Sequence, residues 1–170
     1  MRIFQIKNQV EGFATINFGD INMMSILKTG DVSILDGKHF SWNKTIGNAI
    51  SDCPFFIGAM PIFSTEKLGD ALLNTNAKTA TFNVEGSMFT IVAALPIVGK
   101  VINTEKSKCR LFRNGKIMEV AEYVLNNASD FADIFTLQEY PMYTFCELDI
   151  AKRLQLCHFK HLILKECSII

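Results

Sequence analysis

The sequence lacks the features that mark a membrane-spanning or exported chain. No apolar run approaches the roughly 20 residues that a helix needs to cross a bilayer, and the longest, Met88 to Val98, is interrupted by Pro96. The first residues, MRIFQIKNQVEGF, alternate apolar and polar side chains and lack the charged start and long apolar stretch of a signal peptide. We therefore expect a cytoplasmic protein that does not bind a membrane.

Motifs for nucleotide binding and catalysis are also missing. The chain contains no G-x-x-x-x-G-K-[ST], G-x-G-x-x-G, G-x-S-x-G or H-E-x-x-H pattern, and its ten glycines are scattered at turns. We expect no cofactor. The cysteines are odd in number and show no CxxC spacing, which favours packed, reduced thiols over a disulfide framework: Cys53, Cys109, Cys146, Cys157 and Cys167.

Two local clusters carry side chains that could perform chemistry. CHFKH, with Cys157, His158 and His161, contains metal-ligand residue types without the paired spacing of a zinc site; if this stretch is a strand, the two histidines face opposite sides. Asp130 and Asp133 are a candidate acid–base pair, but acids in such connections commonly bond to nearby backbone amides. We expect no metal site and no catalytic residues, and hence not an enzyme.

The sequence contains enough hydrophobic residues to form one core. Its 170 residues are 49% hydrophobic, with 14 phenylalanines, which fits a single domain over 1–170. We distinguish a strand-rich N-terminal part, 1–50, from the remainder, 51–170.

The pattern of apolar residues predicts an α+β domain, strand-rich with antiparallel hairpins and two or three short helices. Residues 1–40 are predicted as short strands, with Asp36-Gly37 as a hairpin turn, and further hairpins are expected at Glu85-Gly86 and at Asn114-Gly115, the latter as a type I′ turn. Helices are predicted from Thr45 to before Pro54, over Thr65 to Leu73 with Ser64 as N-cap, and within CELDIAKRLQLCHF, before a closing strand in KHLILKECSII. FFIGAMPIFS is predicted as a buried extended segment that lies at a sheet edge or is interrupted at Pro61.

Charge is balanced overall but unevenly spread. Residues 104–116 hold five basic side chains and one acid. Residues 117–151 hold no Lys or Arg and seven acids: Glu119, Glu122, Asp130, Asp133, Glu139, Glu147 and Asp149. Such a run is either a solvated face, with cross-strand pairing of the two segments, or an acidic surface that steers a cationic partner. One basic stretch with one aromatic, Phe112, does not predict nucleic-acid binding.

Several motifs taken together carry a family resemblance. In PIFSTEKLGDAL, Ser64 follows an apolar strand and opens a short helix that runs to Ala71-Leu72. The NVEGSMFTIVAAL hairpin, Ser107 before the next hairpin, the Asp133-Ile134-Phe135 motif and a terminal strand from Phe159 to Leu162 follow. From about residue 50 onward the chain resembles a family of bacterial immunity proteins encoded beside polymorphic toxins, formerly a domain of unknown function. It departs from that pattern at His158, where the family often has a glycine.

The resemblance implies a binding protein: a cytoplasmic antitoxin against an effector of contact-dependent growth inhibition or of a secretion system. It would neutralise its cognate toxin domain by stoichiometric complex formation. If that toxin is a cationic nuclease, the seven acids of 117–151 are the candidate contact surface. Two alternatives stay open: a small-molecule- or protein-binding structural module without a toxin, and a small hydrolytic enzyme that uses a cysteine or the aspartate pair.

Overall fold

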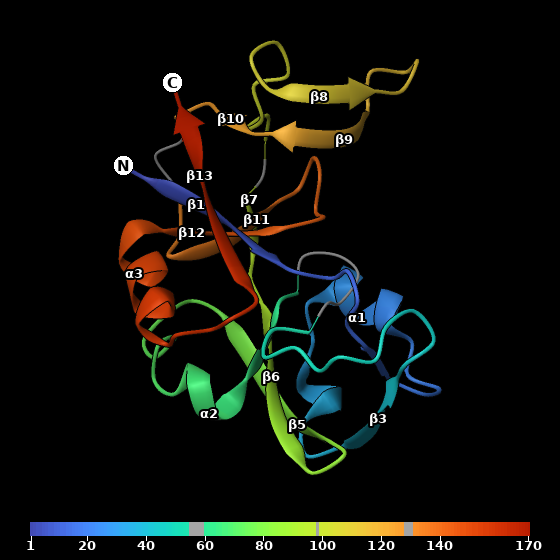
Figure 1. Ribbon diagram of the computed structural model, residues 1–170. Helices are drawn as coiled ribbons and strands as arrows, with labels where there is room; N and C mark the ends of the chain where they lie inside the picture. Colours follow the sequence, from blue (N-terminus) through green and yellow to red (C-terminus); the bar gives the residue numbers. More distant parts are fainter. Residues whose placement is uncertain (55–59, 98, 128–130) are drawn as a thin grey trace.

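The strands of the protein form two large sheets and a separate two-stranded ribbon (Figure 1). The computed structural model describes residues 1–54, 60–97, 99–127 and 131–170. This part of the chain contains one 3-10 helix, η1 (Ser33–Leu35), and the helices α1 (Met23–Thr29), α2 (Thr65–Leu68) and α3 (Leu148–Leu156). The chain is therefore strand-rich and α+β, as expected. None of the helices in the described ranges is both long and apolar enough to cross a membrane.

The N-terminal strand lies in the middle of the six-stranded sheet. β1 (Ile3–Asn8) pairs antiparallel with β12 (Thr144–Glu147) on one side and with β13 (Leu162–Ile169) on the other. The order is β10-β13-β1-β12-β11-β7, completed by β10 (Val124–Leu125), β11 (Ile134–Leu137) and β7 (Pro96–Ile97). The predicted first and closing strands both form, and their pairing joins the two ends of the chain.

Both faces of this sheet are covered by a hydrophobic core. Successive side chains of a strand point to opposite faces, so neighbouring residues of β1 enter different cores. Phe4 belongs to the core beneath α3, whereas its neighbour Ile3 belongs to the core on the opposite face. α3 contributes Ile150, Ala151 and Leu154 to the first core, which are the buried positions of an amphipathic helix. The helix predicted within CELDIAKRLQLCHF is confirmed.

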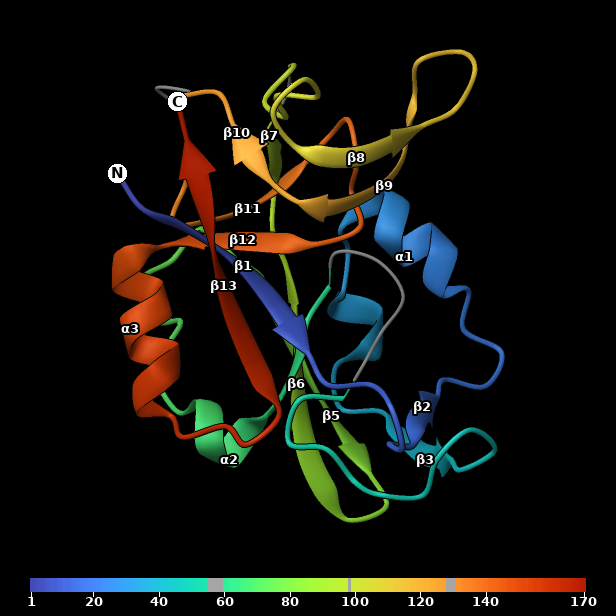
Figure 2. The same ribbon diagram turned by 45° about the horizontal axis from the view of Figure 1, so that its top comes forward.

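The five-stranded sheet has the order β2-β3-β5-β6-β4 and is seen from another angle in Figure 2. Its strands are β2 (Thr15–Asn17), β3 (His39–Asn43), β5 (Lys78–Val84), β6 (Ser87–Ala93) and β4 (Ile62–Ser64). The predicted β5–β6 hairpin forms, and both residues of its turn have positive φ, 47° at Glu85 and 94° at Gly86. β4 lies at the sheet edge, as Pro61 predicts. Residues 55–59 of the expected extended segment lie outside the described residues.

A third core fills the space between the five-stranded sheet and α1. Phe18, Phe40 and Phe82 pack edge to face there, with ring centroids 4.9 to 5.7 Å apart. The prediction of short strands throughout residues 1–40 is wrong at α1. The signal for this helix is present: Asn22 accepts the N–H of Ser25 as N-cap, and Gly30 ends the helix at φ 68°.

Two further predictions in the N-terminal part are wrong. Asp36-Gly37 does not close a hairpin, because η1 precedes it and both residues bond instead to Thr81 of β5. No helix forms between Thr45 and Pro54. In that segment Gly47 lies against the backbone of Gly12. A Cβ added at residue 47 would lie 2.3 Å from the carbonyl carbon of Gly12, so only glycine fits at this position.

The helix after β4 is shorter than predicted. Ser64 does occupy the N-cap position, but its side chain makes no capping hydrogen bond, and α2 ends at Leu68 instead of Leu73. Gly69 follows at φ 48° and ψ −129°, a conformation outside the helical region, and turns continue to residue 74.

The two-stranded ribbon of β8 (Lys108–Leu111) and β9 (Ile117–Glu122) projects from the body in both views (Figures 1 and 2). Its hairpin was predicted, but the turn differs from type I′. Gly115 alone of the expected pair has positive φ, 79°, and the N–H of Phe112 donates to the carbonyl of Lys116 at 2.8 Å. The loop therefore has the longer form in which one glycine takes the left-handed position.

Candidate functional site

The three buried cysteines are poor nucleophiles and poor metal ligands. All five are free thiols, and Cys53, Cys146 and Cys167 are buried. Burial raises the pKa of Cys146 to about 12 and that of Cys167 to about 11, and it raises the pKa of Cys53 further above its usual range. The thiolate, which is the reactive form, is therefore scarce at neutral pH for these three residues.

The two histidines of CHFKH do not lie on a strand, because β13 begins only at Leu162. His158 is exposed and follows α3 with φ 55°. His161 is largely buried, and its ring lies 4.4 Å from that of Phe13. Across the described ranges, no group of three or more His, Cys, Asp or Glu side chains is arranged to hold a metal ion.

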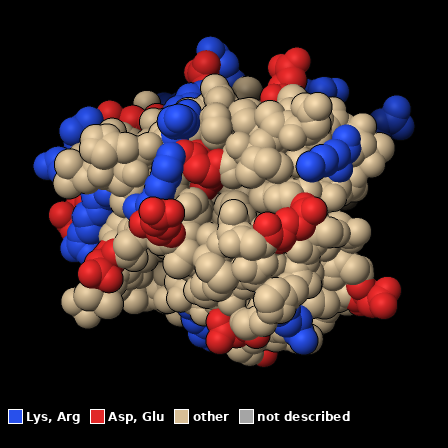
Figure 3. All heavy atoms as spheres, turned by 60° about the horizontal axis from the view of Figure 1, so that its bottom comes forward, with Lys and Arg blue, Asp and Glu red and all other residues tan. Residues whose placement is uncertain are grey.

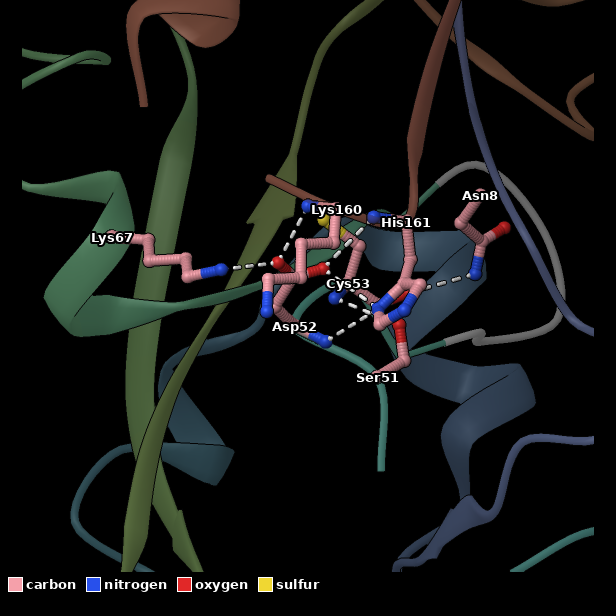
Figure 4. A network of polar contacts seen from close by, with 7 residues as sticks. All are labelled: Asn8, Ser51, Asp52, Cys53, Lys67, Lys160 and His161. Carbon is pink, nitrogen blue, oxygen red and sulfur yellow. Dashed lines mark hydrogen bonds and ion pairs between the residues drawn. The ribbon is translucent and has the colours of Figure 1, made fainter. Parts of the chain in front are cut away.

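The densest polar network of the described chain surrounds Asp52, which the sequence did not single out (Figure 4). One carboxylate oxygen accepts the ammonium of Lys67 at 2.6 Å and the N–H of Lys160 at 2.7 Å. The other accepts the N–H of His161 at 3.1 Å and lies 3.0 Å from its Nδ1. The carbonyl of Asp52 also accepts the N–H of Ser64 at 2.7 Å. Asp52 thus ties β4 and α2 to the start of β13, and so joins the two sheets.

The electrostatics of Asp52 agree with a structural role in linking these segments. Its side chain is only 11% exposed. Burial raises the pKa of Asp52, but the hydrogen bonds from Lys67 and from the N–H groups of Lys160 and His161 outweigh burial, so the pKa lies below its usual value. The carboxylate is therefore ionised at neutral pH, with its oxygens occupied by protein donors.

An Asp–His contact also occurs in hydrolases, but the described residues around Asp52 show no hydroxyl or thiol placed to act as a nucleophile beside His161. Nδ1 of His161 accepts the N–H of Asp52 at 3.3 Å, and the adjacent Ser51 is buried, its hydroxyl accepting the N–H of Cys53 at 3.0 Å. A nucleophile would need its hydroxyl free to meet a substrate. Among the described residues, the contacts of Asp52 link β4, α2 and the residues before β13.

The structure divides the predicted acidic surface into two groups at opposite ends of β11. Asp133 precedes that strand, and its carbonyl accepts the N–H of Glu147, which is the N-cap residue of α3. Asp149 lies in the first turn of α3 and pairs with Arg153 at 2.6 Å. These three acids form the helix-end group. Asp130 lies outside the described residues.

The other three acids lie on or beside the projecting ribbon. Lys108 pairs with Glu122 at 2.8 Å and Arg110 with Glu119 at 3.4 Å, so the cross-strand pairing of basic and acidic segments is confirmed. Glu139 accepts the backbone N–H of Ile102. Figure 3, which views the molecule from below, likewise shows acidic and basic side chains interspersed over a largely uncharged face.

The end of the ribbon is apolar as well as charged. Leu111, Phe112 and Met118 are 45%, 50% and 38% exposed, and together with Arg113 they line one shallow hollow. Large apolar side chains gathered on a projecting element are unusual on a surface that stays in water. Val120 of β9 anchors the ribbon in the core, and the hydroxyl of Tyr140 donates to the carbonyl of Met118 at 3.3 Å. We name Leu111, Phe112 and Met118 the ribbon tip.

No family model matches the chain, and no curated protein matches it. The immunity-protein resemblance therefore stays a prediction from the residues themselves.

Proposed function

We propose that this protein is an immunity protein of the cytoplasm, which binds a cognate bacterial toxin domain and neutralises it by forming a stoichiometric complex. The observation that carries the proposal is the ribbon tip, an apolar surface on a projecting hairpin whose base bears paired charges. Protein interfaces combine such an apolar centre, rich in Met and aromatic residues, with a polar rim.

The places of the family-like motifs support this proposal. Ser64 is the N-cap residue of α2, and Phe135 of the Asp133-Ile134-Phe135 motif is completely buried. His158, where the family often has a glycine, adopts φ 55°, a backbone conformation that glycine adopts freely. His158 therefore adopts the same kind of backbone conformation that a glycine at this position would adopt.

The acids contribute to the proposed contact in two ways. Glu119 follows Met118 of the ribbon tip directly and Glu122 lies at the base of the ribbon, and their ion pairs with β8 would form part of the rim. Asp133 and Glu147 have no ion pair within the described residues, so their charge is the more available for steering a cationic toxin. The interface would cover about 1,200–2,000 Å² in total, the usual size for a specific complex.

The chain is to be co-expressed with the toxin domain encoded next to it, and survival and co-purification are to be measured. The F112D/M118D double variant should lower the affinity at least about tenfold, because it removes the apolar centre of the contact. L156D, at a 74% exposed site on α3, is the matched control and should bind normally.

The charges are tested separately. E119K/E122K and D133K/E147K should slow association and reduce its salt dependence, whereas D20K/D70K at exposed sites elsewhere should not. Glu139 is not substituted in these variants, because its carboxylate accepts the backbone N–H of Ile102 and its replacement would also disturb the fold. If the wild-type chain neither protects the cells nor co-purifies with the toxin domain, the proposed function is contradicted. Normal binding by F112D/M118D would move the interface away from the ribbon.

A further inference from the structure

A cavity of about 390 Å³ lies where the two large sheets meet. The last turn of α1, from Leu27 to Gly30, forms one side of it. The ends of the five-stranded sheet, at Lys78 and Ala93, and the edge of the six-stranded sheet, at Pro96 and Thr136, form the rest. Its volume is within the range of about 300–1,000 Å³ that is typical of small-molecule sites, which often occur at such junctions.

The space arises from the way β6 crosses from one sheet to the other. β4 pairs with β6 from Phe89 to Ile91, and the N–H of Val92 still donates to the carbonyl of Pro61 at 2.9 Å, but at Ala93 the described residues on that side no longer form a strand. The chain then passes through Ala94 and Leu95 into β7. The small side chains Ala93 and Ala94 leave room at the crossing, and Leu95 is 61% exposed.

The described lining combines apolar side chains with two lysines and the neutral polar residues Thr29, Thr136 and Gln138, and it contains no carboxylate. Leu27, Leu95 and Pro96 supply hydrocarbon surface, and Lys28 and Lys78 supply ammonium groups. Lys78 also interacts electrostatically with Asp31, outside the lining. The two lysines act as point charges without the fork of an arginine, and the helix end that faces the cavity is the negative one. This combination suits a single negative charge better than a phosphate dianion.

We propose that this cavity binds a small amphiphile that has a hydrocarbon or aromatic body and one carboxylate. The body contacts the apolar wall formed by Leu27, Leu95 and Pro96, and the carboxylate lies near the ammonium groups of Lys28 and Lys78. Such a site is independent of the proposed toxin contact, because no residue of the ribbon tip lines the cavity.

The test is calorimetric titration of the whole chain with sodium decanoate at millimolar concentration, below its micelle threshold. Decyltrimethylammonium bromide and 1-decanol serve as probes with a positive and a neutral head group. Decanoate should bind with one molecule per chain and more tightly than either control, because only decanoate pairs its head group with the lysines.

Two variants locate the binding. K28E/K78E should weaken decanoate binding at least about tenfold by reversing the charge at the head-group position, whereas K44E/K152E, with the same charge change at exposed sites elsewhere, should not. L95D should have a similar effect, and L73D, at a comparably exposed site of 60%, is its control.

Absence of decanoate binding would overturn the proposal. So would equal binding of the cationic probe, or decanoate binding that both cavity variants leave unchanged. Thermal melting of every variant separates loss of the site from loss of the fold, since L95D and K28E/K78E alter exposed side chains and should keep the melting temperature of the wild type within a few degrees.

Discussion

Asp52 illustrates how a single buried carboxylate can decide where distant segments meet. Its partners come from α2 and from the approach to β13, and the contact with His161 spans 109 residues of sequence. A partly buried charge of this kind stabilises only when its oxygens are all satisfied, as they are here. Removing the charge while keeping the shape leaves Lys67 and two backbone N–H groups with a weaker partner.

We therefore expect D52N to lower the free energy of unfolding by about 2–4 kcal/mol at neutral pH. Because folding depresses the pKa of Asp52, its stabilisation is present above the unfolded pKa of about 3.9 and is lost as the pH falls through the folded pKa. Urea unfolding of both proteins from pH 7 down to pH 3 should show the difference shrinking below about pH 4.

The control for this experiment is D149N. Asp149 is 70% exposed, and its pair with Arg153 spans one helical turn, so the substitution should change stability by less than about 0.5 kcal/mol. Equal effects of D52N and D149N would contradict a special role for Asp52.

At the scale of elements, the end of α3 shows how the chain turns from a helix to its last strand. The C-cap residue Cys157 is still helical, and His158 then adopts φ 55°, where a side chain with a Cβ is strained. His158 is exposed, and its N–H donates to the carbonyl of Gln155 at 3.2 Å. A glycine at this position would keep that backbone bond and remove the strain.

H158G should accordingly raise the free energy of unfolding by about 0.5–1 kcal/mol, measured by thermal or urea denaturation. H158A is the matched control, because it removes the imidazole but keeps the Cβ, and it should give no gain. A gain of the same size in both variants would assign the effect to the imidazole instead of the backbone.

At the scale of the whole molecule, the two ends of the chain complete one sheet. β1 has hydrogen-bonded partners on both sides, and its side chains enter both cores of that sheet. β3 of the five-stranded sheet likewise has partners on both sides, β2 in antiparallel and β5 in parallel orientation. The N-terminal 50 residues therefore contribute to both sheets.

Deleting residues 1–9 should abolish the cooperative unfolding transition, because β12 and β13 would each lose a partner strand and the buried faces would be opened. Circular dichroism during heating measures this directly. A chain that lacks only residues 1 and 2 keeps β1 whole, loses an exposed ion pair between Arg2 and Glu166, and should melt nearly as the full chain does. A sharp transition at the normal temperature without residues 1–9 would refute this account.

Local elements were the predictable part of the fold. The turns at Glu85-Gly86 and Gly115, the apolar spacing of α3 and the edge position that Pro61 imposes depend on interactions within a few residues. Where a local signal met a competing long-range contact it failed. Asp36-Gly37 bonds to β5 instead of closing a hairpin, and Gly47 packs against residue 12 instead of entering a helix.

The α+β class, the hairpins at Glu85 and Gly115, the last helix and the final strand follow from local sequence patterns, because steric and hydrophobic preferences act along neighbouring residues. Only the tertiary structure decided that β1 lies between β12 and β13, that Asp52 meets His161, and that the acidic run separates into two groups. It also decided where the cavity lies. These features depend on contacts between segments far apart in the chain, whose free energies are set by how the whole molecule packs and not by any local pattern.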